Sequence, residues 1–183
     1  MIPDRDSVEL ELLILRCCRG DSRAQEELVR RFERSLFYFV RRIVRDEANA
    51  WDAMQKTWLR IFRGLSKPLP PSALKAWLFR VARNTALNHV RDERRHQIST
   101  DEAIEMHAEA SDSVGFSSDD AEEIHLALDR LNLADREALT LFFLEELSVR
   151  EMSEVLGAPE GTFRSRLHFA KQRLRTILEK RND

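Results

Sequence analysis

The sequence predicts an all-α protein with two small helical domains joined by a flexible acidic linker. Apolar residues recur at spacings of three and four along most of the chain, which is the period of an amphipathic helix. No segment shows the sustained apolar and polar alternation of a half-buried strand. Residues 98–123 are rich in Ser, Asp and Glu and only weakly periodic. We therefore predict an N-terminal domain at 1–97, the linker at 98–123, and a C-terminal domain at 124–183.

Two helices are expected at the start of the N-terminal domain. Ser7 is a candidate cap for a first helix that ends near residue 19. Ser22 and Gln25 have the spacing of a capping box, in which each side chain satisfies a free backbone amide of the first turn. They open a long helix whose apolar positions continue at helical spacings to Val44.

A third and a fourth helix follow. A turn at residues 46–49 leads into the third helix, residues 50–63, which Gly64 ends. A loop with three prolines precedes the fourth helix, which runs from about residue 72 to about residue 95. The outward face of the third helix carries Asp52, Gln55, Lys56, Leu59 and Arg63. An exposed leucine among polar groups indicates a contact surface, although isolated surface leucines are also ordinary.

Two helices open the C-terminal domain, and a helix-turn-helix follows them. Ser148 and Glu151 have the spacing of a capping box for its first helix. Gly157 supplies the left-handed conformation that ends this helix, and Pro159 suits the start of the next. Three independent signals therefore coincide at the spacing of a DNA-reading motif.

The second helix of this motif has two different faces. Its apolar stripe consists of Phe163, Leu167, Ala170, Leu174 and Leu178. Its polar face consists of Thr162, Ser165, His168 and Gln172, with Arg164, Arg166, Lys171 and Arg173 beside it. Such a face suits base edges in the major groove with phosphates on either side. The alternative is an ordinary amphipathic helix pair whose arginines are solvated.

The composition is typical of a soluble helical protein, with 43% hydrophobic and 34% charged residues among 183. The apolar runs are too short to cross a bilayer, and the N-terminus is acidic where a signal peptide is basic. We therefore expect a cytoplasmic protein without membrane insertion. Cys17 and Cys18 are adjacent and no His or Cys residues have ligand spacing, so no disulfide, metal or cofactor is expected.

The formal net charge of −2 is unevenly spread. Residues 97–123 contain nine Asp or Glu and no Lys or Arg. The rest of the chain therefore has 23 of the 32 acidic residues and all 30 Lys and Arg, so it is net basic. Arginines gather within residues 80–95 and 164–181. Two basic regions therefore bracket an acidic connector, which favours a nucleic-acid partner.

The fourth helix contains the second basic pattern, AWLFRVARNTALNHVRDERR. Its predicted apolar side carries Trp77, Val81, Leu87 and Val90. Its donor side carries Arg80, Arg83, Asn84, Asn88 and Arg91, which suit phosphates and base edges. Trp77 has two interpretations: stacking on an unpaired base, or burial in the core.

In two blocks the chain resembles the extracytoplasmic-function group of bacterial RNA polymerase sigma factors, within the sigma-70 superfamily. The first block, residues 20–95, includes RRFERSLFYFVRRIV, AWDAMQKTWLRIFRGL and AWLFRVARNTALNHVR. The second, residues 124–178, includes LNLADREALTLFFLEELSVREMSEVLGAPEGTFRSRLHFAKQRLR. The second block alone is similar to LuxR-type regulators as well, whereas the two blocks in this order are specific to the family.

The resemblance implies a sigma factor, without catalytic activity, that directs polymerase to promoter DNA. The N-terminal domain would recognise and melt the minus-ten element, and the C-terminal domain would read the minus-thirty-five element as duplex. The implied minus-ten residues are Lys67, Lys75, Trp77, Arg80, Arg83, Asn84, Asn88 and Arg91. The implied minus-thirty-five residues are Pro159, Glu160, Gly161, Thr162, Arg164, Ser165, Arg166, His168 and Lys171.

The resemblance also implies partner surfaces. Core RNA polymerase would meet this chain through its β′ clamp helices and its β flap, and a loop at residues 65–74 would hold a flipped non-template base. The acidic linker would thread toward the RNA exit path. An anti-sigma factor or another regulator is expected because such proteins are often held by one. The residues implied in binding the clamp helices are Asp52, Gln55, Lys56 and Leu59.

The chain departs from the family's pattern at two places. Trp51 and Lys56 stand near Asp52 where acidic residues are common, so the polymerase-facing surface is less negative than expected. Lys56 should then weaken polymerase binding. A phosphate on Thr57 or on a nearby hydroxyl is one hypothesis for restoring complementarity, against simple burial of that threonine. Phe169 stands where an arginine is common and is expected on the polar side of its helix.

Two other functions stay open from the residues alone. A stand-alone transcriptional regulator would bind duplex operators tightly without polymerase, whereas a sigma factor would need core polymerase and prefer unpaired DNA through its first domain. A nucleic-acid enzyme is the third reading. It has little support, because the five histidines lack ligand spacing and no P-loop or nucleophile motif is present.

Overall fold

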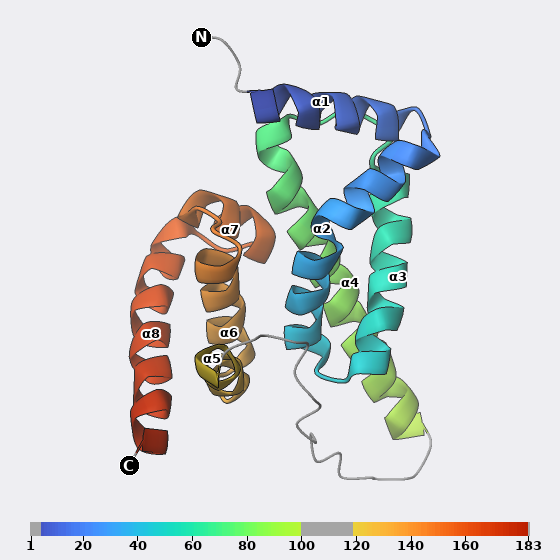
Figure 1. Ribbon diagram of the computed structural model, residues 1–183. Coiled ribbons are helices and arrows are strands. Elements are labelled where there is room, and N and C mark those ends of the chain that lie inside the picture. The colour runs from blue at the N-terminus through green and yellow to red at the C-terminus, as the bar shows by residue number, and fades with distance from the viewer. Residues whose placement is uncertain (1–4, 100–118, 183) are drawn as a thin grey trace.

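The computed structural model describes residues 5–99 and 119–182, and every regular element within these ranges is a helix (Figure 1). The predicted all-α fold is confirmed. In chain order the elements are α1 Arg5–Cys18, α2 Ser22–Val44, α3 Glu47–Gly64, α4 Pro71–Ser99, α5 Asp119–Asp129, α6 Leu133–Leu139, the π-helical turn η1 Thr140–Leu144, α7 Val149–Leu156 and α8 Glu160–Asn182.

Helices α1 to α4 form the N-terminal unit. The helices α2, α3 and α4 pack against one another, and α1 lies across one end of this group (Figure 1). The rings of Phe39 on α2 and Phe79 on α4 meet edge to face, with centroids 5.4 Å apart, and both are fully buried. Met54 and Ile61 of α3 belong to the same core. The bundle forms because each helix turns its apolar side inward.

Short acidic side chains cap two of these helices. The carboxylate of Asp21 accepts hydrogen bonds from two amides in the first turn of α2, so the predicted cap Ser22 is instead the first helical residue. Asp46 caps α3, which therefore begins at Glu47, earlier than predicted. Ser7 lies inside α1 and does not cap it. A carboxylate is favoured at both caps because it also meets the positive end of the helix dipole.

Helix α4 is buried on more than one side. Its predicted apolar side, formed by Trp77, Val81, Leu87 and Val90, is only half-buried, which corrects the prediction. The buried hydrophobic side chains are Leu74, Ala76, Leu78, Phe79, Ala82 and Ala86. The reason is tertiary, because α4 packs against α2 and α3 and also against α7. A helix with neighbours on several sides has no single apolar stripe.

Helices α5 to α8 form the C-terminal unit. Asn132 caps α6 by accepting a hydrogen bond from the amide of Asp135. Helix α6 passes directly into η1, after which the amide of Glu145 donates to the carbonyl oxygen of Thr140 at 3.1 Å. Helix α8 runs beside α6, and the pair is tied by an ion pair between Arg173 and Asp135. This unit carries the helix-turn-helix at α7 and α8.

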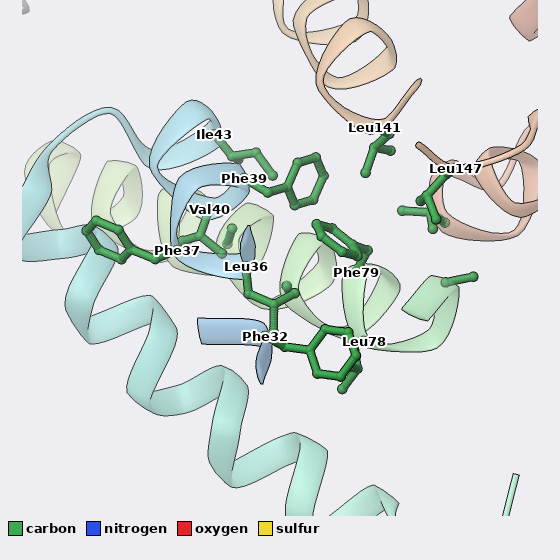
Figure 2. Close-up of a cluster of buried hydrophobic side chains, with 14 of the residues drawn as sticks. Phe32, Leu36, Phe37, Phe39, Val40, Ile43, Leu78, Phe79, Leu141 and Leu147 are labelled. Atoms are coloured by element: carbon green, nitrogen blue, oxygen red, sulfur yellow. The ribbon is translucent and has the colours of Figure 1, made fainter. Parts of the chain in front are cut away.

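The two units pack against each other along α2 and α4. Figure 2 shows Leu141 and Leu147 of the C-terminal unit beside Phe39 and Ile43 of α2 and Phe79 of α4. All five side chains are buried. The contact is therefore an apolar core shared between units that are far apart in sequence.

The predicted linker is only partly described. Helix α4 extends through Ser99 and α5 begins at Asp119, so both ends of the predicted 98–123 linker are helical. Its middle, residues 100–118, lies outside the described residues. In the two described ranges, no helix is both long enough and apolar enough to cross a membrane.

Candidate nucleic-acid interface

Local hydrogen bonds fix the start of α7 and the turn between α7 and α8. The amide of Ser148 donates to the carboxylate of Glu151 at 2.8 Å, and the amide of Glu151 donates to the Ser148 hydroxyl at 3.3 Å. Gly157 ends α7 in the left-handed conformation, with φ of 68°. The Ser153 hydroxyl then donates to the carbonyl oxygen of Ala158 at 2.6 Å. The predicted capping box and glycine turn are confirmed, and together they set the direction in which α8 leaves the turn.

The first half of helix α8 buries one face and exposes the other, as predicted, whereas Leu174 and Leu178 of the predicted stripe are only half-buried. Phe163, Leu167 and Ala170 are buried against the C-terminal unit. Arg166 is half-buried, and its guanidinium carbon lies 5.4 Å from the ring centre of Phe163. The other predicted duplex-reading residues are exposed: Pro159, Glu160, Gly161, Thr162, Arg164, Ser165, His168 and Lys171. Polar groups therefore cover the N-terminal half of α8, which is the part that enters a major groove in helix-turn-helix proteins.

Aromatic side chains lie next to this reading face. Phe169 is 53% exposed and meets His168 edge to face, with ring centres 5.3 Å apart. Its predicted place on the polar side is confirmed. The ammonium of Lys171 lies 4.7 Å from the ring centre of Phe143 on η1, within cation–π range. Lys171 therefore reaches back toward η1 as well as toward solvent.

Five of the predicted single-strand residues form one stripe along α4. Trp77, Arg80, Asn84, Asn88 and Arg91 succeed one another at spacings of three and four. Arg80, Asn84 and Arg91 are exposed, and the other two are half-buried. At 1.5 Å per residue the stripe is about 20 Å long. It offers guanidinium and amide donors in a row, which suits the backbone and bases of an extended strand.

The two remaining residues of α4 face the C-terminal unit. Arg83 pairs with Glu137 of α6 through two bonds, Nε to Oε1 at 2.7 Å and Nη2 to Oε2 at 3.2 Å. Lys75 donates to the carbonyl oxygen of Glu145, and its ammonium lies 3.6 Å from the carboxylate of the same residue. Two of the predicted donors therefore pair with acids of the C-terminal unit, whereas Arg80, Asn84 and Arg91 are exposed.

The acidic partners of this pair are deeply buried. Glu137 is 3% exposed and Glu145 is 5% exposed. Burial raises the pKa of Glu145 above its usual value, and the charge of Lys75 opposes that rise. The sequence carries no signal for either contact, because the partners are 54 and 70 positions apart. Neither acid was therefore a candidate from the sequence.

A second set of contacts joins α2 to α5. The Nη1 atom of Arg42 lies 2.6 Å from a carboxylate oxygen of Asp129 and donates to the carbonyl oxygen of His125 at 3.2 Å. The hydroxyl of Tyr38 is hydrogen-bonded to Nδ1 of His125. Burial lowers the pKa of His125 and raises the pKa of Tyr38 to about 12. A neutral imidazole and a neutral phenol therefore meet between the units.

The indole of Trp77 packs against the end of α3. A Cβ atom at Gly64 would lie 2.8 Å from its ring, so the ring touches the backbone there. Of the two interpretations of Trp77, this contact supports packing. Lys67, in the loop between α3 and α4, is exposed.

The outward face of α3 is exposed as periodicity predicts. It carries Asp52, Gln55, Lys56 and Leu59. Leu59 is 56% exposed, and the nearby Trp51 is 43% exposed and stacks on Phe37 with ring centres 4.1 Å apart. The ammonium of Lys56 lies 3.2 Å from Nδ1 of His89 on α4. An apolar and a charged group therefore share one accessible face.

Thr57 has no accessible surface. It is fully buried, and its hydroxyl donates to the carbonyl oxygen of Ala53 at 2.7 Å. A kinase cannot reach a hydroxyl in this position. The hypothesis of a regulatory phosphate on Thr57 is therefore wrong, because the residue lies on the inner stripe of α3 with Met54 and Ile61.

Among the described residues, no three His, Cys, Asp or Glu side chains gather as a metal site would require. Cys17 is buried, and burial raises the pKa of its thiol to about 11. That thiol is therefore protonated at neutral pH and a poor nucleophile.

Both units match known sequence families. Residues 28–96 match the family described as sigma-70 region 2, and residues 121–174 match sigma-70 region 4. The chain is 30% identical over 178 residues to the RNA polymerase sigma-H factor of Pseudomonas aeruginosa, covering 91% of this chain and 92% of that protein. It is 29% identical over 153 residues to the ECF RNA polymerase sigma factor SigM of Bacillus subtilis, covering 83% and 93%.

Solved structures have a similar fold. The sigma factor RpoE of Bartonella quintana, solved with the anti-sigma factor NepR, is 24% identical, with a TM-score of 0.73 over 84% of this chain and 96% of that chain. CnrH, solved with the cytosolic domain of CnrY, is 22% identical, with a TM-score of 0.68 over 93% and 97%. At these identities the likeness concerns the fold.

Proposed function

The chain belongs to the extracytoplasmic-function family of sigma-70 factors, which act in transcription initiation and are not enzymes, and we propose that it directs core RNA polymerase to promoters through two separate DNA surfaces. The observation that carries this proposal is the presence of two exposed donor surfaces on one chain, the stripe on α4 and the face of α8. One suits an unpaired strand and the other suits a duplex. The protein works in the cytoplasm, where the polymerase is.

The C-terminal unit, residues 124–183, reads the minus-thirty-five element. The N-terminal half of α8 enters the major groove, with Arg164 and Ser165 directed at base edges or phosphates. Its accessible polar face and its apolar stripe buried on the other side support this role. Arg166, stacked over Phe163, contributes from the edge of the same face.

The N-terminal unit, residues 1–97, recognises and melts the minus-ten element. The exposed guanidinium groups of Arg80 and Arg91 hold backbone phosphates, and the Asn84 amide meets a base edge. Lys67 and the loop before α4 lie at the entrance to this stripe. Asn84→Ala should then impair promoter opening more than duplex binding, which permanganate footprints beside gel shifts on closed and pre-melted templates measure. Equal loss on both templates, or no loss on either, would contradict the role.

The outward face of α3 docks on the polymerase. Leu59 offers apolar area, and Asp52 and Gln55 offer polar partners for the β′ clamp helices. The C-terminal unit contacts the β flap. An anti-sigma factor is the expected regulator, since NepR is the partner named for the Bartonella quintana protein of the same fold.

The decisive experiment is a pull-down with core RNA polymerase followed by run-off transcription from a promoter library. We expect the chain to be retained by core polymerase and to confer promoter-specific transcripts. Tight, specific duplex binding by the isolated chain, with no polymerase retained and no transcript, would identify a stand-alone regulator instead. A matched Asp52→Ala and Gln55→Ala variant should lose retention while keeping its helical content.

A further inference from the structure

One large apolar side chain lies in the middle of the exposed polar face of α8. Four exposed residues succeed one another along this face at spacings of three and four: Thr162, Ser165, Phe169 and Gln172. The ring of Phe169 is 53% exposed, and the buried apolar stripe of the helix lies on the opposite side. The ring is therefore directed away from the core, toward whatever the face of α8 meets.

Neighbouring side chains on the same face hold this ring in place. It meets the imidazole of His168 edge to face, with ring centres 5.3 Å apart and an angle of 75° between the planes. The side-chain amide of Gln172 donates to Nε2 of His168 at 3.1 Å. The hydroxyl of Ser165 donates to the carbonyl oxygen of Gly161, also at 3.1 Å. Because these groups are already ordered, binding through this face loses little side-chain freedom.

Three cations beside this face contact groups of their own unit. The guanidinium carbon of Arg166 lies 5.4 Å from the ring centre of Phe163, and the ammonium of Lys171 lies 4.7 Å from that of Phe143. Arg173 pairs with a carboxylate of α6. The middle of the face therefore presents an exposed aromatic ring between cations that aromatic rings or a carboxylate already engage.

A phenyl ring in a major groove is stabilised by an apolar neighbour. It neither donates nor accepts a conventional hydrogen bond, so contact with an amino or carbonyl group of a base removes water without replacing it. The apolar group that base pairs display in this groove is the C5-methyl group of thymine. The four residues from Ser165 to Phe169 span about 6 Å along the helix axis. This distance corresponds to at most about two base-pair steps of duplex DNA.

We propose that Phe169 is a specificity-determining residue: its ring packs on the C5-methyl group of a thymine in the minus-thirty-five element, within about two base pairs of the base that faces Ser165. This inference rests on the proposed role of α8 as the duplex reader, and it adds the base that one position of the element carries. Cytosine at that position is disfavoured because it lacks the methyl group. Cytosine methylated at C5 is accepted better than cytosine itself.

The first experiment locates the thymine. Run-off transcripts are sequenced from holoenzyme acting on a promoter library that is randomised across the minus-thirty-five element. Wild type should enrich thymine at one position, and Phe169→Ala should lose that preference while keeping the preferences at other positions. Phe169→Leu, which keeps an apolar side chain, should retain part of it. Alanine and leucine both favour the helix, so neither change threatens the fold. Identical preferences for wild type and Phe169→Ala at every position would overturn the proposal.

The second experiment changes a single methyl group. Holoenzyme binding to the selected promoter duplex is measured by fluorescence anisotropy with thymine or uracil at the located position, because uracil lacks only the methyl group. Wild type should bind the uracil duplex roughly three- to fivefold more weakly, which is the effect of one buried methyl group. Phe169→Ala should bind both duplexes equally. With a cytosine–guanine pair at the position, methylation of the cytosine at C5 should tighten binding of wild type and not of Phe169→Ala.

Arg164→Ala is the control, since Arg164 is exposed on the same helix. It should weaken binding to the thymine and uracil duplexes alike, so the ratio of the two affinities stays at the wild-type value. The same ratio in Phe169→Ala as in wild type would overturn the proposal. So would a loss of core-polymerase retention in Phe169→Ala, which would assign the ring to a protein partner. Failure of the proposed function has a different result: Arg164→Ala would bind as wild type does, and wild type would select no base at any position of the library.

Discussion

The turn of the helix-turn-helix depends on the left-handed conformation of Gly157, and a single substitution can test this. Gly157 has φ of 68°, and a Cβ atom placed there meets no other atom within 4 Å. Substitution by alanine therefore adds no clash, and its cost is the left-handed conformation alone. For a residue with a Cβ atom this conformation costs about 1–2 kcal/mol. Gly157→Ala should lower the free energy of unfolding by that amount.

Gly161 is the matched control. It is exposed near the start of α8, a Cβ atom there also meets nothing within 4 Å, and its φ is not positive. Alanine is favoured over glycine in a helix, so Gly161→Ala should be neutral or stabilise by up to about 1 kcal/mol. The two variants make the same chemical change in equal space and should act with opposite sign.

Urea unfolding followed by circular dichroism measures both. If the free energy of unfolding falls by about 2.5 kcal/mol per molar of urea, Gly157→Ala should lower the urea concentration at the unfolding midpoint by roughly 0.4–0.8 M. Gly157→Asn should recover part of the loss, because asparagine tolerates the left-handed region better than alanine does. Equal midpoints for Gly157→Ala and Gly161→Ala would refute the argument that the turn depends on glycine's conformational freedom.

Three further predictions concern charge. Arg164→Ala should weaken holoenzyme binding to the upstream element by about 1–3 kcal/mol if Arg164 contacts a base. If Arg164 contacts a phosphate, the slope of the log binding constant against log salt concentration should fall by about one. An unchanged affinity together with an unchanged slope would exclude Arg164 as a contact. Lys56→Gln should tighten polymerase binding by about 0.5 kcal/mol at low salt, since it removes a cation from the docking face; no gain at low salt would remove the repulsion argument. Burial, and after it the charge of Arg42, lowers the pKa of His125 below its ordinary 6.5. The neutral imidazole therefore contributes stability that is fully present above pH 6.5 and is lost as the pH falls through the pKa of the folded state. The free energy of unfolding of wild type should therefore fall more steeply from about pH 7 to pH 5 than that of His125→Gln, and parallel profiles would contradict this.

Local signals in the sequence predicted the helix-turn-helix well. Ser148 and Glu151 form the capping box, and Gly157 ends α7 in the left-handed conformation. These contacts join residues a few positions apart, so spacing alone specifies them. Where two polar residues competed for one cap, spacing was insufficient, and Asp21 rather than Ser22 caps α2.

Periodicity predicted the faces of helices with one buried side. The inner stripe of α3, with Met54 and Thr57, is confirmed. The apolar stripe of α8 is confirmed for its first three residues, whereas Leu174 and Leu178 are only half-buried. Periodicity failed for α4, where Phe79 is fully buried and Trp77 only half-buried. Helix α4 packs against α2 and α3 of its own unit and against α7 of the other unit. A helical wheel assumes one buried side and therefore cannot predict which residues such a helix buries.

The sequence by itself determined the all-α fold, the caps of the helix-turn-helix and the family, because each depends on residue types at short, regular spacing. Only the tertiary structure decided which donors of α4 are free. Arg83 and Lys75 read as open phosphate ligands in the sequence, yet they hold Glu137 and Glu145 of the other unit. The physical reason is that the desolvation of a charge, and the partner that compensates it, depend on what lies across the interface and not on what lies next in the chain.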